Sequence, residues 1–116
     1  YMLAADRNNP LVNKYYDPLH PAVLQVLQHM VEVADRSKRG LCLCGEMASD
    51  PLCFIALVGM GMREFSMPSP FIPRTKALLA QLSVRSARQA MKEVLGSTDS
   101  TAIRARLNQV LPRPPQ

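Results

Sequence analysis

Residues 40–51 (GLCLCGEMASDP) constrain the fold more than any other stretch, because they combine an alternating apolar run, a glycine and a helix-start signal. In an extended segment, Leu41 and Leu43 point to one side, while Cys42 and Cys44 point to the other. The aspartate-proline pair at positions 50–51 is typical of the first turn of a helix. The run therefore predicts a strand that ends at Cys44, followed by a loop and a helix.

Its place at the end of this strand makes Cys44 a candidate catalytic residue. In parallel α/β folds, the chemistry gathers where strands end and loops begin. The alternative interpretation is structural, since free cysteine is among the residue types most often buried. Cys42, two positions earlier, is expected to pack in the core.

A long amphipathic helix is predicted before this strand. Pro21 suits its first position, and the helix is expected to run to about Lys38 and to end at Gly40. Its apolar side chains recur at helical spacing and predict the face that packs on the core: Leu24, Leu27, Val31 and Ala34.

Four further helices and one strand are predicted after Cys44. A helix from Leu52 is apolar on nearly every side, which indicates burial, and Gly59 and Gly61 are expected to close it. Residues 64–67 favour a brief second strand, and a proline at position 73 opens the next helix. Capping signals then predict two last helices, one from Ser83 to Leu95 and one that starts at Ser97 or Thr98.

The predicted order is helix, strand, helix, strand and three helices, which indicates a helix-rich α/β fold with two short parallel strands. Two parallel strands joined by a helix leave both sheet edges open, so such a pair is normally part of a larger parallel sheet. The sequence shows no internal repeat.

Composition narrows the class of protein. The formal charge is +5, but the basic residues are scattered and tryptophan is absent, so we expect no nucleic-acid partner. No stretch is apolar and long enough to cross a bilayer, and no signal-peptide pattern is present. The three cysteines form no disulfide framework, and together these features predict a cytoplasmic protein with reduced thiols and no membrane partner.

From Tyr1 to about Lys76, the chain resembles the last part of the phosphoenolpyruvate-binding barrel of the Enzyme I family of bacterial phosphotransferase systems. The resemblance is closer to the nitrogen-related paralogue than to the sugar-transport enzyme. It is carried, in the family's order and spacing, by residues 4–10 (AADRNNP), 16–24 (YDPLHPAVL), 43–48 (LCGEMA), 59–61 (GMG) and 65–67 (FSM).

The resemblance implies a (β/α)8 barrel, a fold that takes about 250 residues. Residues 1–82 are then expected to form the carboxy-terminal part of the barrel, residues 83–111 a helical extension unfamiliar in the family, and residues 112–116 a tail. The magnesium ligands and the phosphoacceptor histidine are expected upstream of Tyr1, so this chain alone is expected to be inactive.

The resemblance also implies a reaction, in which the phosphoryl group of phosphoenolpyruvate passes to an enzyme histidine and pyruvate is released. Cys44 is at the family's proton-donor position, and thiols are mostly protonated at neutral pH. Arg7 is at a substrate-binding position, where a guanidinium holds phosphate oxygens. Glu46 is left without a role. The implied partners are a phosphocarrier protein and a second copy of the chain, as a homodimer.

Other functions stay open at this point. One is a metal-binding module using Cys42, Cys44, Cys53 and a histidine, although Cys-x-Cys lacks the paired spacing typical of zinc sites, and neither His20 nor His29 has a ligand pattern around it. A second is a non-catalytic dimerisation or interaction fragment. A third is another phosphoenolpyruvate-utilising enzyme, such as a relative of pyruvate phosphate dikinase or phosphoenolpyruvate synthase. Two departures from the family, a serine at position 49 and Pro-Ser-Pro at residues 68–70, leave the loop geometry open.

Overall fold

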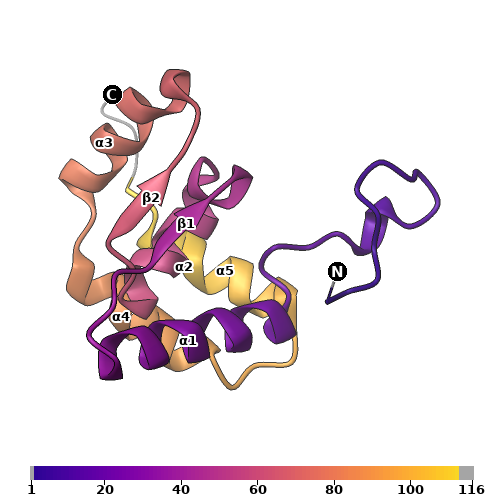
Figure 1. Cartoon of the computed structure of the whole chain (residues 1–116), viewed down its shortest axis with the longest axis horizontal. Coiled ribbons are helices and arrows are strands. Elements are labelled where there is room, and N and C mark those ends of the chain that lie inside the picture. Colours follow the sequence, from indigo (N-terminus) through magenta and orange to yellow (C-terminus); the bar gives the residue numbers. More distant parts are fainter. Residues whose placement is uncertain (1, 113–116) are drawn as a thin grey trace.

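A computed structural model describes residues 2–112 as a helix-rich α/β fold in the predicted order of elements (Figure 1). The strands are β1 (Cys42–Cys44) and β2 (Glu64–Ser66), and single 3-10 turns cover Asn13–Tyr15, Glu46–Ala48 and Ser69–Phe71. The five helices are α1 (Pro21–Arg36), α2 (Pro51–Met60), α3 (Ile72–Gln81), α4 (Val84–Val94) and α5 (Ser100–Val110). Residues 113–116 of the predicted tail lie outside the described part of the chain.

The two strands pair in parallel, with Leu43 opposite Phe65 in the register. Both of these side chains are half-buried and pack against the core, and the ring of Phe65 lies 4.8 Å from that of Phe54 on α2. The predicted alternation along β1 is confirmed, because the leucine faces the core while its two cysteine neighbours are exposed. One face of the strand pair is therefore covered by α2.

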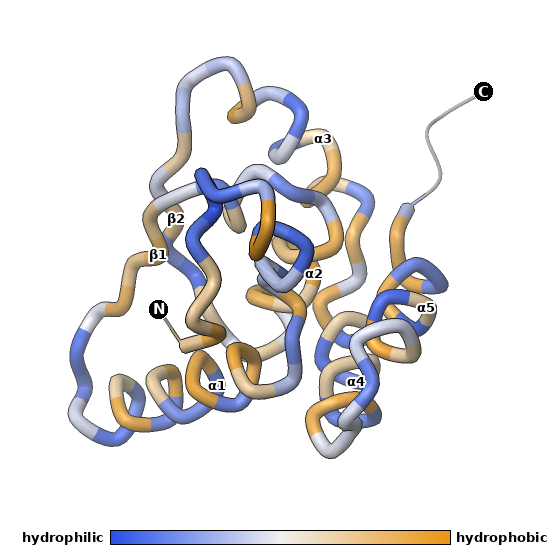
Figure 2. Tube along the Cα trace, turned by 90° about the vertical axis from the view of Figure 1, so that its right-hand side faces the viewer, coloured by the Kyte–Doolittle hydropathy of each residue, from blue (hydrophilic) through white to orange (hydrophobic). Residues whose placement is uncertain are grey.

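The centre of the molecule is α2, whose residues from Cys53 to Met60 are all buried, as its continuous apolarity predicted. Figure 2 shows α2 between the strand pair on one side and α4 and α5 on the other. Ala87 and Met91 of α4 and Ile103 and Leu107 of α5 belong to the same buried cluster. The helices after residue 83 therefore share one hydrophobic core with the strands.

The segment before α1 runs apart from the helices (Figure 1). It is irregular apart from one 3-10 turn, and close to the start of α1 the Asp17 carboxylate accepts a hydrogen bond from the Arg104 guanidinium of α5. His20 caps α1, because its Nδ1 accepts a hydrogen bond from the Ala22 N–H. His20 thus has a structural role at this helix start. Within residues 2–112, no helix has the length and apolarity needed to cross a membrane.

The end of α1 differs from the prediction. The helix stops at Arg36, and the left-handed residue after it is Lys38 (φ 52°), not Gly40. The Lys38 N–H donates to the Asp35 carbonyl, and the Arg39 N–H donates to the Ala34 carbonyl. These two bonds form a Schellman motif, which usually has glycine at the position of Lys38.

Two other predicted boundaries are wrong. Gly61 closes α2 in a left-handed conformation (φ 115°), as predicted, but Gly59 lies inside the helix, where a Cβ atom would come within 2.5 Å of the Ala87 carbonyl oxygen of α4. The last helix is capped by Asp99, whose carboxylate accepts the Thr101 N–H at 2.8 Å, rather than by Ser97 or Thr98. The helix start predicted at Asp50 and Pro51 and the cap predicted at Ser83 are confirmed.

Candidate functional site

Cys44 is the last residue of β1, and its side chain is exposed at the carboxyl end of the strand. The parallel register places Ser66, the last residue of β2, directly opposite. Paired residues in a parallel sheet project from the same face, so the thiol and the Ser66 hydroxyl are neighbours at this edge. The edge is where the sequence predicted functional groups.

Gly45 turns the chain sharply after Cys44. Its φ of 118° and ψ of −168° lie in a region that side chains other than glycine rarely adopt. The Gly45 N–H donates to the Ser66 carbonyl at 3.4 Å, so the turn is tied to the end of β2. The chain then enters the short turn Glu46–Ala48 and the start of α2.

Arg7 reaches this loop through Glu46. One guanidinium nitrogen lies 3.6 Å from Glu46 Oε2, and both side chains are largely exposed, at 61% and 78%. An exposed ion pair of this kind contributes little to stability. Glu46, to which the sequence assigned no role, therefore brings the Arg7 guanidinium beside the loop that follows Cys44.

The other two cysteines have opposite environments. Cys42 is exposed, which corrects the expectation that it packs in the core, because the alternation of β1 puts it on the same face as Cys44. Local desolvation, the Cys44 thiol and the Glu64 carboxylate raise the pKa of Cys42. Cys53 is buried on α2, and burial together with the Asp50 carboxylate raises the pKa of that thiol.

Four exposed side chains form what we call the bare face of the strand pair, opposite the face that packs on α2: Cys42, Cys44, Glu64 and Ser66. Sequence analysis singled out the first two and missed Glu64 and Ser66. The parallel register is what brings them beside the cysteines, and a register between distant strands has no local sequence signal. The end of the second predicted strand was the one available clue to Ser66.

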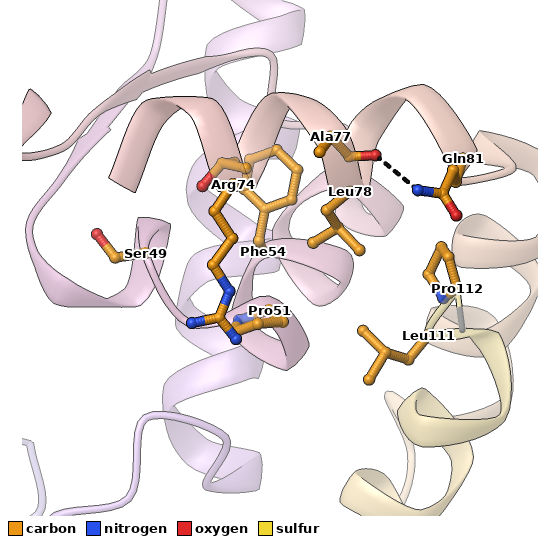
Figure 3. Close-up of a pocket in the computed structure, with 10 residues that line it drawn as sticks. Ser49, Pro51, Phe54, Arg74, Ala77, Leu78, Gln81, Leu111 and Pro112 are labelled. Atoms are coloured by element: carbon orange, nitrogen blue, oxygen red, sulfur yellow. Dashed lines mark hydrogen bonds between the residues drawn. The ribbon is translucent and has the colours of Figure 1, made fainter. Parts of the chain in front are cut away.

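A separate groove lies on the helical side of the molecule, between α2, α3 and the end of α5 (Figure 3). Figure 3 shows Phe54, Leu78 and Leu111 lining it, with the Arg74 side chain extended toward Pro51. Neither Cys44 nor Arg7 lines this groove. The Ser49 hydroxyl at its rim is buried and has no hydrogen-bond partner in the described part of the chain.

The described residues do not bring three or more metal ligands together. Among residues 2–112, no group of three or more histidine, cysteine, aspartate or glutamate side chains is placed to hold one ion. Cys53 is separated from Cys42 and Cys44 by its burial on α2.

A match to a known protein family shows to which family the chain belongs. The family described as "PEP-utilising enzyme, PEP-binding domain", where PEP is phosphoenolpyruvate, matches residues 1–84. The chain belongs to the PEP-utilising enzyme family.

Three similar proteins are named as phosphotransferases or phosphoryl-transfer proteins. The chain is 39% identical over 104 residues to a Salmonella typhimurium protein named "Phosphoenolpyruvate-dependent phosphotransferase system", covering 90% of the chain and 14% of that protein. It is 38% identical over 95 residues to the "Phosphoenolpyruvate-protein phosphotransferase" of Buchnera aphidicola from Acyrthosiphon pisum, covering 82% and 17%. It is 36% identical over 109 residues to "Multiphosphoryl transfer protein 2" of Escherichia coli, covering 94% and 13%.

The coverage of these alignments has two consequences. The chain spans only a small part of each of these PEP-utilising relatives, 14% of the Salmonella protein. Alignment to "Multiphosphoryl transfer protein 1" of Escherichia coli, 34% identical, covers 97% of the chain. The family match ends at residue 84, while the similarity to this relative extends into α4 and α5.

Proposed function

We propose that this chain is part of a PEP-dependent phosphotransferase, which moves the phosphoryl group of PEP to an enzyme histidine and releases pyruvate. The observation that supports this most is the exposed thiol of Cys44 at the carboxyl edge of the strand pair, beside the loop that Arg7 reaches through Glu46. The names of the relatives favour the same chemistry. A dikinase or synthase of the same family is a weaker candidate, because the relatives named here are phosphotransferases.

The proposed role of Cys44 is to complete the formation of pyruvate. Loss of the phosphoryl group leaves the enolate of pyruvate, whose terminal carbon must gain a proton. The S–H bond of Cys44 breaks as the new C–H bond forms, and the resulting thiolate later regains a proton from water. A thiol at the rim of a sheet can meet a substrate and solvent in turn.

The proposed role of Arg7 is to hold the phosphate group. Its guanidinium is exposed and is engaged only by the Glu46 carboxylate among the ion pairs of the described residues. A phosphate dianion competes well for such a group, since guanidinium nitrogens match phosphate oxygens in pairs. Substrate would then displace Glu46 from Arg7.

The strand pair fits the proposal that residues 1–82 are the carboxy-terminal part of a (β/α)8 barrel. Its strands are parallel, its helices cover one face, and the other face carries small and polar side chains. In such a barrel, helices lie outside and the opposite strand face looks inward, with the chemistry at the carboxyl ends. The missing strands would then enclose the bare face.

We propose further that the complete enzyme uses magnesium, transfers its phosphoryl group to a phosphocarrier protein, and acts as a homodimer in the cytoplasm. The described residues do not fit a magnesium site, because no three ligand side chains come together among residues 2–112. The ligands must therefore come from the larger part of the enzyme, and magnesium would supply charge neutralisation at the phosphate oxygens.

The test is Cys44→Ala in the longer protein that carries this chain. We expect the enzyme histidine still to be phosphorylated by PEP, while pyruvate forms roughly 100-fold or more slowly, because only carbon protonation is lost. Quench-flow measurement of phosphoenzyme and pyruvate in the same samples separates the two steps. Cys42→Ala, which changes the neighbouring thiol, is the control and should retain wild-type pyruvate formation. Unchanged pyruvate formation in Cys44→Ala would remove the proposed role.

A further inference from the structure

The mechanism proposed above uses one of the two thiols on the bare face and leaves Cys42 without a function. Cys42 and Cys44 are both exposed, and they are two positions apart on β1. Residues two apart on a strand project from the same face at a spacing of roughly 6.6 Å. The two sulfur atoms therefore share one patch of solvent-accessible surface.

This spacing favours a bridging atom over a direct bond between the sulfurs. A disulfide needs Cβ atoms about 3.5–4.5 Å apart, so β1 would have to distort to form one. Each Sγ can instead turn toward the other about its Cα–Cβ bond. A soft ion that makes bonds of about 2.3 Å to each sulfur then fits between them, since it adds two bond lengths to the span. The raised pKa of Cys42, to which the Cys44 thiol contributes, is consistent with two sulfurs in close reach.

The number of available ligands restricts which ions suit the pair. Within the described residues, no set of three or more ligand side chains can hold one ion, and Cys53 is buried, with 1% of its surface exposed. Tetrahedral zinc needs four ligands and does not match two thiolates. Two sulfur ligands suit soft species with two open coordination positions, because soft ions select thiolates over carboxylates such as Glu64.

We propose that Cys42 and Cys44 form a two-thiolate binding site for soft, thiophilic ions and trivalent arsenicals, which disables Cys44 as a proton donor when it is filled. The binding part stands on the geometry of β1 alone. The inhibitory part rests on the proposed function, since a sulfur bonded to the bound atom has no proton to give to the enolate.

Phenylarsine oxide is the probe, because its arsenic has two positions that thiols can take. Both S–H bonds break and two As–S bonds form, while the oxide oxygen leaves as water with the two protons. No oxidant or reductant takes part, so the binding is reversed by an excess of a small dithiol.

The experiment measures the mass and the dissociation constant of the adduct on the 116-residue chain, without PEP. We expect one phenylarsenic group per chain in the wild type and in Cys53→Ser. The Cys42→Ser and Cys44→Ser variants should each bind phenylarsine oxide roughly 100-fold more weakly. Only one As–S bond can then form, and the gain in affinity from binding through two linked thiols is lost. Counting the thiols that react quickly with a maleimide checks the fold, with two expected in the wild type because Cys53 is buried.

The outcomes separate the two parts of the proposal. Equal affinity in either single variant, or no adduct in the wild type, would overturn the site. Rapid reaction of Cys53 would overturn the geometry on which the site depends. If the adduct also forms on the longer enzyme, as mass measurement would show, but pyruvate formation continues at its normal rate, the site stands and the role proposed for Cys44 fails.

Discussion

Lys38 holds a backbone conformation that suits glycine better than lysine. Its φ of 52° closes the hydrogen-bonded motif at the end of α1. A left-handed conformation brings Cβ close to the backbone, which costs roughly 1–2 kcal/mol for most residues. Local sequence rules pointed to Gly40 for this place, because they weigh residue type and do not see which residue the hydrogen bonds select.

We therefore predict that Lys38→Gly stabilises the chain by about 1 kcal/mol. The reason is relief of the strained backbone with the same hydrogen bonds kept. Urea unfolding followed by circular dichroism measures the difference. Gly40→Ala is the matched control and should change the free energy of unfolding little, since the nearest atom to its new Cβ is 3.7 Å away. A loss of stability in Lys38→Gly would contradict the assignment of the strain.

The backbone conformation of Ser49 shows which geometry the loop before α2 adopts. The family resemblance has glycine at this position, which put the loop before α2 in doubt. The backbone of Ser49 has φ −96° and ψ −18°, a right-handed conformation open to any residue. The loop can therefore take this shape with serine, although the buried hydroxyl is left without a hydrogen-bond partner among residues 2–112.

At the scale of elements, the sequence predicted the order of helices and strands, the apolar face of α1 and the buried helix α2. These three predictions are confirmed because hydrophobic periodicity and helix caps are local sequence signals, which tertiary packing does not alter. Gly59 was misread as a helix end, since its function is to let α4 approach α2. The neighbours of Cys44 on β2 were missed for a related reason. Close packing and strand register join segments far apart in the sequence, and no local pattern encodes them.

The contact between α2 and α4 leads to a prediction for Gly59→Ala. The added methyl group would lie 2.5 Å from the Ala87 carbonyl oxygen and 2.6 Å from the Met91 side chain. The nearest atom belongs to the backbone, so the helices must move apart. We expect a net loss of about 1–2 kcal/mol in the free energy of unfolding, because a clash with the backbone costs about 3 kcal/mol at the upper end of overpacking, more than the gain of roughly 1 kcal/mol in helix propensity.

Thermal and urea unfolding of Gly59→Ala measure that loss. Gly96→Ala is the control, because nothing lies within 4 Å of its new Cβ, and it should be neutral or slightly stabilising. If both variants unfold like the wild type, the two helices are not as close as described.

The pair α4 and α5 is joined by Glu93, whose carboxylate is bound by Arg106 and Gln89. The hydrogen bond from Arg106 is the largest of the effects that lower the pKa of Glu93, ahead of the hydrogen bond from Gln89 and the charge of Arg106. Because the pKa of Glu93 is lower in the folded state, its ion pair stabilises the fold at pH values above the usual glutamate pKa of roughly 4.3. This stabilisation is lost as the pH falls from about 5 through the lowered value.

We predict that Glu93→Gln destabilises the chain at neutral pH and that the difference from the wild type disappears in acid, below the lowered pKa. Free energies of unfolding at a series of pH values measure this. Glu32→Gln is the matched control, because Glu32 also accepts a hydrogen bond from a glutamine four residues earlier but forms no ion pair in the described residues. It should show a weaker dependence on pH. The same dependence in both variants would contradict the role of Arg106.

At the scale of the whole molecule, we predict that the 116-residue chain alone neither binds magnesium with PEP nor releases pyruvate. The proposed substrate contact from this chain is Arg7, which is largely exposed, and no set of three or more metal-ligand side chains comes together in residues 2–112. Calorimetric titration with PEP and magnesium, followed by a coupled assay for pyruvate, measures both. The longer enzyme is the positive control, and turnover by the chain alone would show that the site is more complete than we infer.

The bare face also makes the purified chain prone to intermolecular disulfide formation. Two solvent-facing thiols on every copy can be joined between molecules by dissolved oxygen, and such covalent pairs accumulate during storage. A band of twice the mass on a gel without reductant would then report air oxidation and say nothing about natural assembly. Sedimentation in the presence of a thiol reductant, or with both exposed cysteines replaced by serine, is what separates an artefact of handling from a true homodimer.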